Sequence, residues 1–215
     1  MDFEVGVHRV AQRFVPQRVN GGYPPLVVYY HRFPAFLTTE DWKPELPLRA
    51  HPALLEAAKK IGVMADFIVI TSNFVHLFQA EIEQASGCQV LSMIDTTLAE
   101  VQRRQWRRVG VLGFGDPVVY TRPLGTVGLA TETIAGDLRD CLDGAIHEVM
   151  EGRVKADSAG AARQAVDELG ARGVDGIILG CTEIPLLLGD GASAADLVNP
   201  LELLAHAAVT CALQP

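Results

Sequence analysis

The sequence DGIILGCTEIP, residues 175–185, decides the fold because it reads as a buried strand followed by a helix. Residues 176–179 are apolar or glycine throughout, which is typical of a strand with both faces covered. Pro185 is typical of the first turn of a helix. Cys181 stands between them, and a cysteine in this position is more often a small packing residue than a reactive group. Both interpretations of Cys181 stay open on this stretch alone.

The same order of strand and helix recurs along the chain. Continuous Val, Ile and Leu runs alternate with amphipathic segments, which predicts an α/β fold with mainly parallel sheets covered by helices on both faces. We predict strands within residues 27–30, 66–71, 89–94, 108–114 and 174–179. We predict helices within residues 51–62, 74–87, 95–106, 134–152, 157–173 and 199–213. Asp95 or Thr96 is expected to cap the third of these helices, and Asp157 or Ser158 to open the fifth.

A weak internal repeat connects the two halves of the chain. Superposing Asp66 on Asp175 aligns two strands and places Ser72 opposite Cys181, each just before a predicted helix. The carboxyl ends of parallel strands are where doubly wound sheets bind their ligands. The repeat therefore predicts that a hydroxyl and a thiol face each other across one cleft.

Composition limits the classes of function. The 215 residues carry a net charge of −8, so attraction to nucleic acid or to anionic membranes is not expected. The four scattered cysteines include no CxxC pair and indicate neither a disulfide framework nor a metal site. No leader and no apolar run of membrane-spanning length stands out. We therefore expect a cytoplasmic protein whose partner is a small molecule. The cysteines expected in the core are Cys88, Cys141 and Cys211.

Cys181 and Ser72 suit proton transfer at a carbon atom. A thiol at the start of a helix has a lowered pKa, so the sequence predicts that Cys181 acts as a base. N–H groups at the same helix start would hold a substrate carboxylate and stabilise its developing charge. Ser72 is the weaker acid/base and needs an activating neighbour. His76, one turn further along, is on the correct face to assist, and packing within its own helix is the alternative.

These stretches resemble the motifs of a known family, the cofactor-independent aspartate/glutamate racemases. GCTEIPLLL, residues 180–188, closely resembles their second cysteine motif. SNFVH, residues 72–76, resembles their first motif, Cys-Asn-Thr-Ala-His, with serine in place of cysteine. NPLELLAHAAV, residues 199–209, is similar to their C-terminal helix. The resemblance extends from about residue 26 to residue 212.

The resemblance implies two pseudo-symmetric α/β domains, residues 1–97 plus 199–215 and residues 98–198, with the active site in the cleft between them. It implies inversion at the α-carbon of aspartate or glutamate, or binding of a related dicarboxylate, by a homodimer without pyridoxal phosphate. By position in the motifs, Cys181 and Ser72 are the catalytic acid/base residues. The expected substrate contacts are Asn73, Thr182, Glu183, Thr71 and Arg32, and the expected supporting residues are His76 and His206.

Departures from the family pattern leave alternatives open. Because Ser72 replaces a cysteine, the chain is a racemase, a single-cysteine decarboxylase or isomerase that acts on one face, or a homologue that binds a dicarboxylate without turnover. The family's opening strand and Gly-rich loop have no counterpart here, and residues 3–14 instead predict a helix with one apolar face. We therefore expect a neighbouring strand to have an exposed edge unless another subunit covers it.

Overall fold

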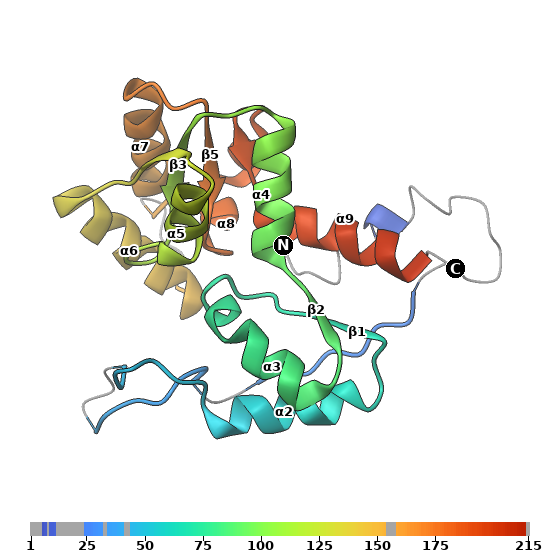
Figure 1. Ribbon diagram of the computed structural model, residues 1–215. Helices are drawn as coiled ribbons and strands as arrows, with labels where there is room; N and C mark the ends of the chain where they lie inside the picture. Colours follow the sequence, from blue (N-terminus) through green and yellow to red (C-terminus); the bar gives the residue numbers. More distant parts are fainter. Residues whose placement is uncertain are drawn as a thin grey trace.

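The structure is a computed structural model that describes residues 6–7, 9–11, 24–31, 34–40, 44–153 and 158–213. In Figure 1 the elements from α2 to β2 form a lower half and those from α4 to α8 form an upper half. The helices are α2 (Pro52–Gly62), α3 (Gln79–Ser86), α4 (Met93–Arg103), α5 (Val118–Thr126), α6 (Gly136–Met150), α7 (Ser158–Ala171), α8 (Ile184–Leu188) and α9 (Pro200–Leu213), with 3-10 helices η1 (Phe74–Phe78) and η2 (Gly189–Ser193). The strands are β1 (Phe67–Val69), β2 (Gln89–Leu91), β3 (Arg108–Leu112), β4 (Ala130–Glu132), β5 (Gly176–Leu179) and β6 (Leu197–Val198). No helix in the described ranges combines the length and the apolar character that crossing a bilayer requires.

The upper half is built on a four-stranded parallel sheet in the order β4–β3–β5–β6. Ile177 and Leu179 point to one face, where α6, α7 and α8 pack against them. Val111 and Ile178 point to the other face, which α4 and α5 cover. Both faces of these strands are therefore buried, which explains their continuous apolar sequences. The predicted α/β class, with parallel sheets flanked by helices, is confirmed.

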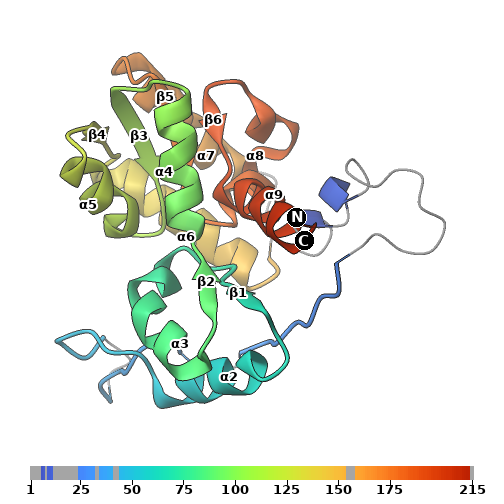
Figure 2. The ribbon, with the colours of Figure 1, turned by 45° about the vertical axis from the view of Figure 1, so that its right-hand side comes forward.

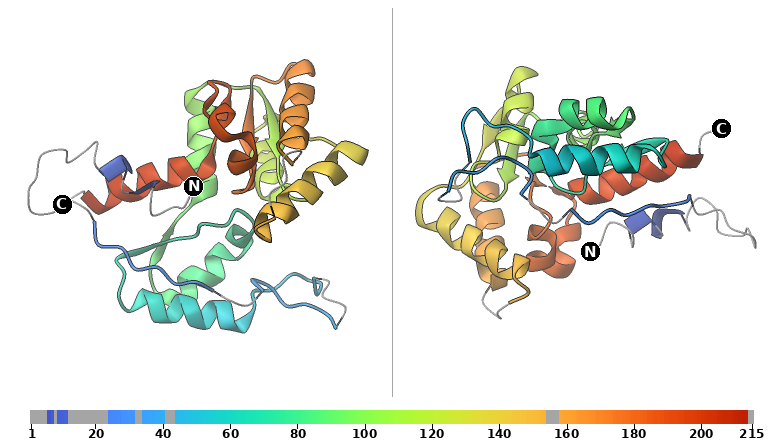
Figure 3. Two further views of the ribbon diagram at one scale, coloured as in Figure 1. Left: turned by 180° about the vertical axis from the view of Figure 1, so that it is seen from behind. Right: turned by 90° about the horizontal axis from the view of Figure 1, so that it is seen from below.

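The lower half contains a two-stranded parallel sheet, β1–β2. Ile68 and Val90 face α2 and α3. Phe67 and Val69, on the opposite face, pack against α9, so the last helix covers a sheet formed early in the chain (Figures 2 and 3). The described part of the N-terminal segment adds buried side chains to the α9 cluster, in agreement with the predicted apolar face: Val7, Val10 and Ala11.

Helix α4 belongs to the cores of both halves. Met93, in its first turn, packs in the cluster under α9. Ile94 and Val101 pack in the cluster that covers β3 and β5. The expected division of the chain between residues 97 and 98 falls within this helix, and that division stays a prediction.

The strand predicted at residues 27–30 is not formed, so that prediction is wrong. Residues 24–31 run without strand pairing, and the side chain of Tyr30 is 84% exposed. A strand needs neighbouring backbone N–H and C=O groups as partners. Among the described residues, β1 pairs with β2 alone, so the apolar run at residues 27–30 does not pair with the edge of β1 that stays open.

Two further expectations need correction. The helix expected from Asp95 begins at Met93, and its cap is Ser92, whose Oγ accepts the N–H of Asp95 at 3.2 Å. A cap requires extended backbone just before the first turn, and Ser92 has it at the end of β2. Ser158 does open α7, whereas Asp157 lies outside the described residues. Cys141 and Cys211 are exposed rather than in the core, because the apolar faces of their helices turn away from them.

Gly176 in β5 is expected to tolerate no side chain. A Cβ there would collide with the buried indole of Trp106. Gly176→Ala is therefore expected to lower the free energy of unfolding by about 1–3 kcal/mol, the usual cost of overpacking. The matched control is Gly144→Ala in α6, where a Cβ meets open space and alanine is expected to add about 0.5–1 kcal/mol. Thermal unfolding of both variants checks the prediction, and equal melting temperatures would contradict it.

Candidate active site

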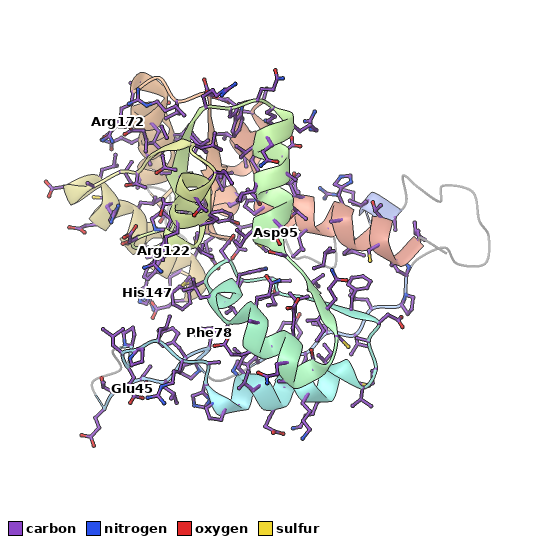
Figure 4. The ribbon with its side chains drawn as sticks, in the orientation of Figure 1. Glu45, Phe78, Asp95, Arg122, His147 and Arg172 are labelled. Atoms are coloured by element: carbon purple, nitrogen blue, oxygen red, sulfur yellow. The ribbon has the colours of Figure 1, made fainter. Side chains whose placement is uncertain are left out.

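The two repeated motifs both follow parallel strands at their carboxyl ends. Ser72 lies in the loop between β1 and η1, and Cys181 lies in the loop between β5 and α8. η1 of the lower half contacts α5 of the upper half, so the loop after β1 reaches the upper half. Figure 4 shows this junction, with Asp95 in the first turn of α4 and Phe78 of η1 below it.

Tyr120 of α5 links the two motifs directly. Its hydroxyl donates a hydrogen bond to Oδ1 of the buried Asn73 at 2.5 Å. Its ring packs on Gly180, the residue before Cys181. Tyr120 is not among the predicted site residues, because its contacts join segments far apart in the chain. The sequence contains one weak signal for a role of Tyr120, namely a tyrosine in a mostly apolar helix. Such a tyrosine is expected to be buried, and a buried tyrosine usually has a hydrogen-bond partner.

Cys181 is buried, with 8% of its surface exposed, and it packs in the core cluster of the upper half. Its Sγ donates to Oε2 of Glu183 at 3.0 Å, and Thr182 Oγ1 donates to the same oxygen at 2.9 Å. The carboxylate of Glu183 thus contacts two of the predicted site residues. The three side chains form one hydrogen-bonded group in the loop before α8.

The expected lowering of the Cys181 pKa is wrong, because the structure raises the pKa of this thiol. Burial contributes most, and the negative charge and hydrogen bonding of Glu183 add to it. Backbone hydrogen bonds from Glu183 and Phe114 favour the thiolate but do not outweigh these effects. Helix α8 was expected to stabilise the thiolate through its dipole. It has only five residues, so its dipole contributes little to the pKa of Cys181. In this structure Cys181 therefore holds its proton and contacts the carboxylate that would accept it.

Glu183→Gln is expected to lower the pKa of Cys181. The amide keeps a hydrogen-bond acceptor beside Sγ but removes the negative charge that disfavours the thiolate. Alkylation of Cys181 by iodoacetamide near pH 8 is expected to accelerate about tenfold, since one pKa unit changes the thiolate fraction by that factor. Mass spectrometry of the peptide that contains Cys181 measures the rate. Glu168→Gln, on α7, is the matched control, and equal rates in both variants would contradict the prediction.

His76 is a supporting residue by its contacts, which go to the backbone around Ser72. Its Nδ1–H donates to the carbonyl oxygen of Ser72 at 2.9 Å, and its Nε2 accepts the N–H of Met93 at 3.0 Å. Both contacts fit the neutral ring, and burial lowers the pKa of His76 despite the Ser72 contact. His76 therefore connects the loop that carries Ser72 to the first turn of α4. No described contact joins its ring to the Ser72 hydroxyl.

A cavity of about 410 Å³ adjoins Ser72. Its lining includes residues 29–31 and residues of β1 and α2. Thr71 and Ser72 supply hydroxyl groups to its lining, and most of the other lining side chains are aliphatic. Cys181, Thr182 and Glu183 are not among the described residues that line this cavity. The described residues that line the cavity thus belong to the lower half, and they include two predicted site residues, Thr71 and Ser72.

Two predicted residues remain, and the structure describes one of them, His206. Arg32 lies outside the described residues, so its predicted role as a carboxylate clamp stays a prediction. His206 lies half-buried on α9, and its backbone carbonyl accepts a hydrogen bond from Thr210 Oγ1 at 2.8 Å. Its supporting role also stays a prediction.

Comparison with known proteins agrees with this architecture of parallel sheets flanked by helices. A sequence profile of the Asp/Glu/Hydantoin racemase family matches residues 7–208, and the chain belongs to that family. An aspartate racemase homologue from Pyrococcus horikoshii OT3 has a solved structure that superposes with a TM-score of 0.73 at 21% identity, over 99% of this chain and 94% of that chain. A Yersinia pestis structure provisionally assigned as an Asp/Glu racemase gives 0.65 at 29% identity, over 75% and 73%. Picrophilus torridus aspartate racemase gives 0.62 at 21% identity, over 74% and 68%.

Proposed function

We propose that this chain is an amino-acid racemase that removes and returns a proton at the α-carbon of aspartate or glutamate, without pyridoxal phosphate. The observation that carries the proposal is the contact of Tyr120 with both Gly180 and Asn73, which brings the Cys181 motif and the Ser72 motif against one side chain. Two acid/base groups on opposite sides of one carbon atom are what inversion requires.

The proposed proton path begins at the Cys181–Glu183 pair. The thiol proton passes to the Glu183 carboxylate over the 3.0 Å hydrogen bond, and the thiolate formed takes the α-proton of the substrate. The electron pair left on the α-carbon delocalises into the substrate carboxylate. In this proposal the Asn73 amide stabilises its charge, and so does the Thr182 hydroxyl once its hydrogen bond to Glu183 is released. Ser72 returns a proton on the opposite face, after which its alkoxide regains a proton from water and Glu183 releases its proton to water. The reverse reaction uses the same groups in the opposite order.

A second candidate function is favoured by the raised pKa of Cys181 together with Ser72. A thiol that holds its proton suits the protonation of a carbanion on one face, and a hydroxyl is a poor partner for the reverse step. A one-sided decarboxylase or isomerase would use Cys181 as the proton donor. Ser72 would then donate a hydrogen bond to the substrate instead of moving a proton.

Deuterium uptake at the α-carbon tests these functions. L- and D-aspartate and L- and D-glutamate are incubated with the protein in heavy water, without added pyridoxal phosphate, and the products are resolved by chirality. Exchange with inversion supports the racemase. Exchange with retention supports the one-sided enzyme. Binding of a dicarboxylate without exchange would indicate that the chain is a binding protein. Absence of exchange with all four amino acids would contradict the racemase proposal.

We also propose that the protein is a cytoplasmic homodimer. The exposed apolar side chains of residues 26–30 and the open edge of β1 are the surfaces that a second subunit would cover. Sedimentation velocity measures the molecular mass in solution. A single species at the mass of one chain would contradict the dimer.

A further inference from the structure

Tyr120 is a buried side chain that touches both motifs of the proposed site. It is fully buried in α5. A Cβ added at Gly180 would lie 3.1 Å from Cδ2 and Cε2 of its ring and 2.7 Å from the carbonyl oxygen of Leu112, so the ring and the β3 backbone together enclose this glycine. Its hydroxyl donates to Asn73 Oδ1. One side chain therefore contacts the residue before Cys181 and the residue after Ser72.

The hydrogen bond from Tyr120 fixes the orientation of the Asn73 amide. Burial raises the pKa of the Tyr120 phenol, with a smaller opposing effect from Thr97, so the O–H group is retained and donates. Its acceptor must be the amide oxygen, because an amide NH₂ only donates. The NH₂ group of Asn73 is therefore directed away from Tyr120. This orientation leaves a donor for a substrate carboxylate.

A second set of hydrogen bonds holds the other side of the same loop. His76 connects the Ser72 carbonyl to the N–H of Met93. Thr97 donates to the Met93 carbonyl at 2.7 Å, and its side chain also reaches the Tyr120 hydroxyl. The loop with Ser72 is thus held at one end by α4 and at the other by α5. Within this network, Tyr120 also contacts Gly180, the residue before Cys181.

We propose that Tyr120 is a positioning residue for the reaction assigned above, on which this inference rests. Its hydroxyl orients Asn73 toward the substrate, and its ring fixes Gly180. Ser72 and Cys181 thereby keep the separation that proton transfer at one carbon atom requires. Tyr120 itself touches no reacting atom, and it acts through Asn73 and through the backbone at Gly180.

Tyr120→Phe is the informative variant, because it keeps the ring against Gly180 and removes only the donor to Asn73. We expect kcat/KM for α-proton exchange to fall about 10- to 100-fold, since small misplacements at a catalytic site have effects of this size. In an Asn73→Ala background the same change is expected to have no further effect, because the partner is already absent. Ser158→Ala is the matched control, since it removes a buried hydroxyl that donates to Glu148 Oε2 at 2.8 Å. It is expected to change stability without changing kcat or KM.

Proton–nitrogen NMR of the Asn73 side-chain amide gives a readout that does not depend on turnover. Its signals are assigned through their loss in Asn73→Ala and are expected to shift in Tyr120→Phe but not in Ser158→Ala. Unchanged Asn73 signals in Tyr120→Phe would overturn the inference. So would unchanged kcat/KM, or losses that add fully in the double variant. If the unmodified chain exchanges no substrate, the proposed function fails, and the NMR comparison alone decides whether Tyr120 positions Asn73.

Discussion

Cys181→Ala is expected to lose α-proton exchange by about 10²–10⁴-fold, the contribution of a positioned general acid or base. Cys181 is the thiol at the end of β5 that contacts Glu183, and alanine removes the only atom of this side chain that can carry a proton. Deuterium incorporation into aspartate and glutamate in heavy water measures the loss. The expected result holds for the racemase and for the one-sided enzyme, because both move the α-proton through this thiol.

The matched control for this variant is Cys141→Ala. Cys141 is an exposed thiol on α6, so its removal is expected to leave the exchange rate unchanged. Melting temperatures of both variants separate loss of chemistry from loss of folded protein, because Cys181 also packs in the core. Exchange that persists in Cys181→Ala, with Cys141→Ala equally active, would rule out Cys181 as the acid/base.

Ser72→Cys is expected to increase inversion about 10²-fold, because a thiol ionises far more readily than a hydroxyl and supplies the second acid/base group. The side chain at position 72 is half-buried and adjoins a cavity, so the larger sulfur atom has space. The measurement is the rate of formation of D-aspartate or D-glutamate from the L-form. The rate of deuterium exchange is expected to rise less than the rate of inversion, because Cys181 already serves one face.

Ser193→Cys controls for the mere presence of an additional thiol, since Ser193 is exposed in η2. It is expected to leave the ratio of inversion to exchange unchanged. If Ser72→Cys gives no more inversion than Ser193→Cys while Cys181 remains essential, Ser72 does not face the substrate. The one-sided enzyme would then be the better account.

Most of the fold could be predicted because its strands are buried on both faces. The apolar runs that became β1, β3 and β5 are continuous, and the helices between them start and stop at Pro, Ser and Gly signals such as Pro52 and Gly87. The failure at residues 27–30 has a physical reason. A run of β-branched and aromatic residues indicates only that a strand would be tolerated there. A strand forms only where the run pairs with the edge of another strand, and the local sequence does not reveal that pairing.

The site was predictable to the extent that it is local. Ser72 and Cys181 could be proposed because each follows a strand and stands in a short motif, and their catalytic roles stay predictions. The direction of the Cys181 pKa shift was not found, because it depends on burial and on which way the Glu183 side chain turns. Tyr120 was not found for a related reason: a tyrosine that bonds to a residue 47 positions away leaves no periodic signal in the sequence.

The position of α4 couples the two halves energetically. Met93 completes the apolar cluster of the lower half, and Ile94 and Val101 complete a cluster of the upper half. Because the same helix fills both clusters, we expect the two halves to unfold as one cooperative unit, so that a destabilising change in one half lowers the stability of the other. Because the two halves share α4, we expect only small rotations between them, and we expect a substrate to reach the proposed site through side-chain movement.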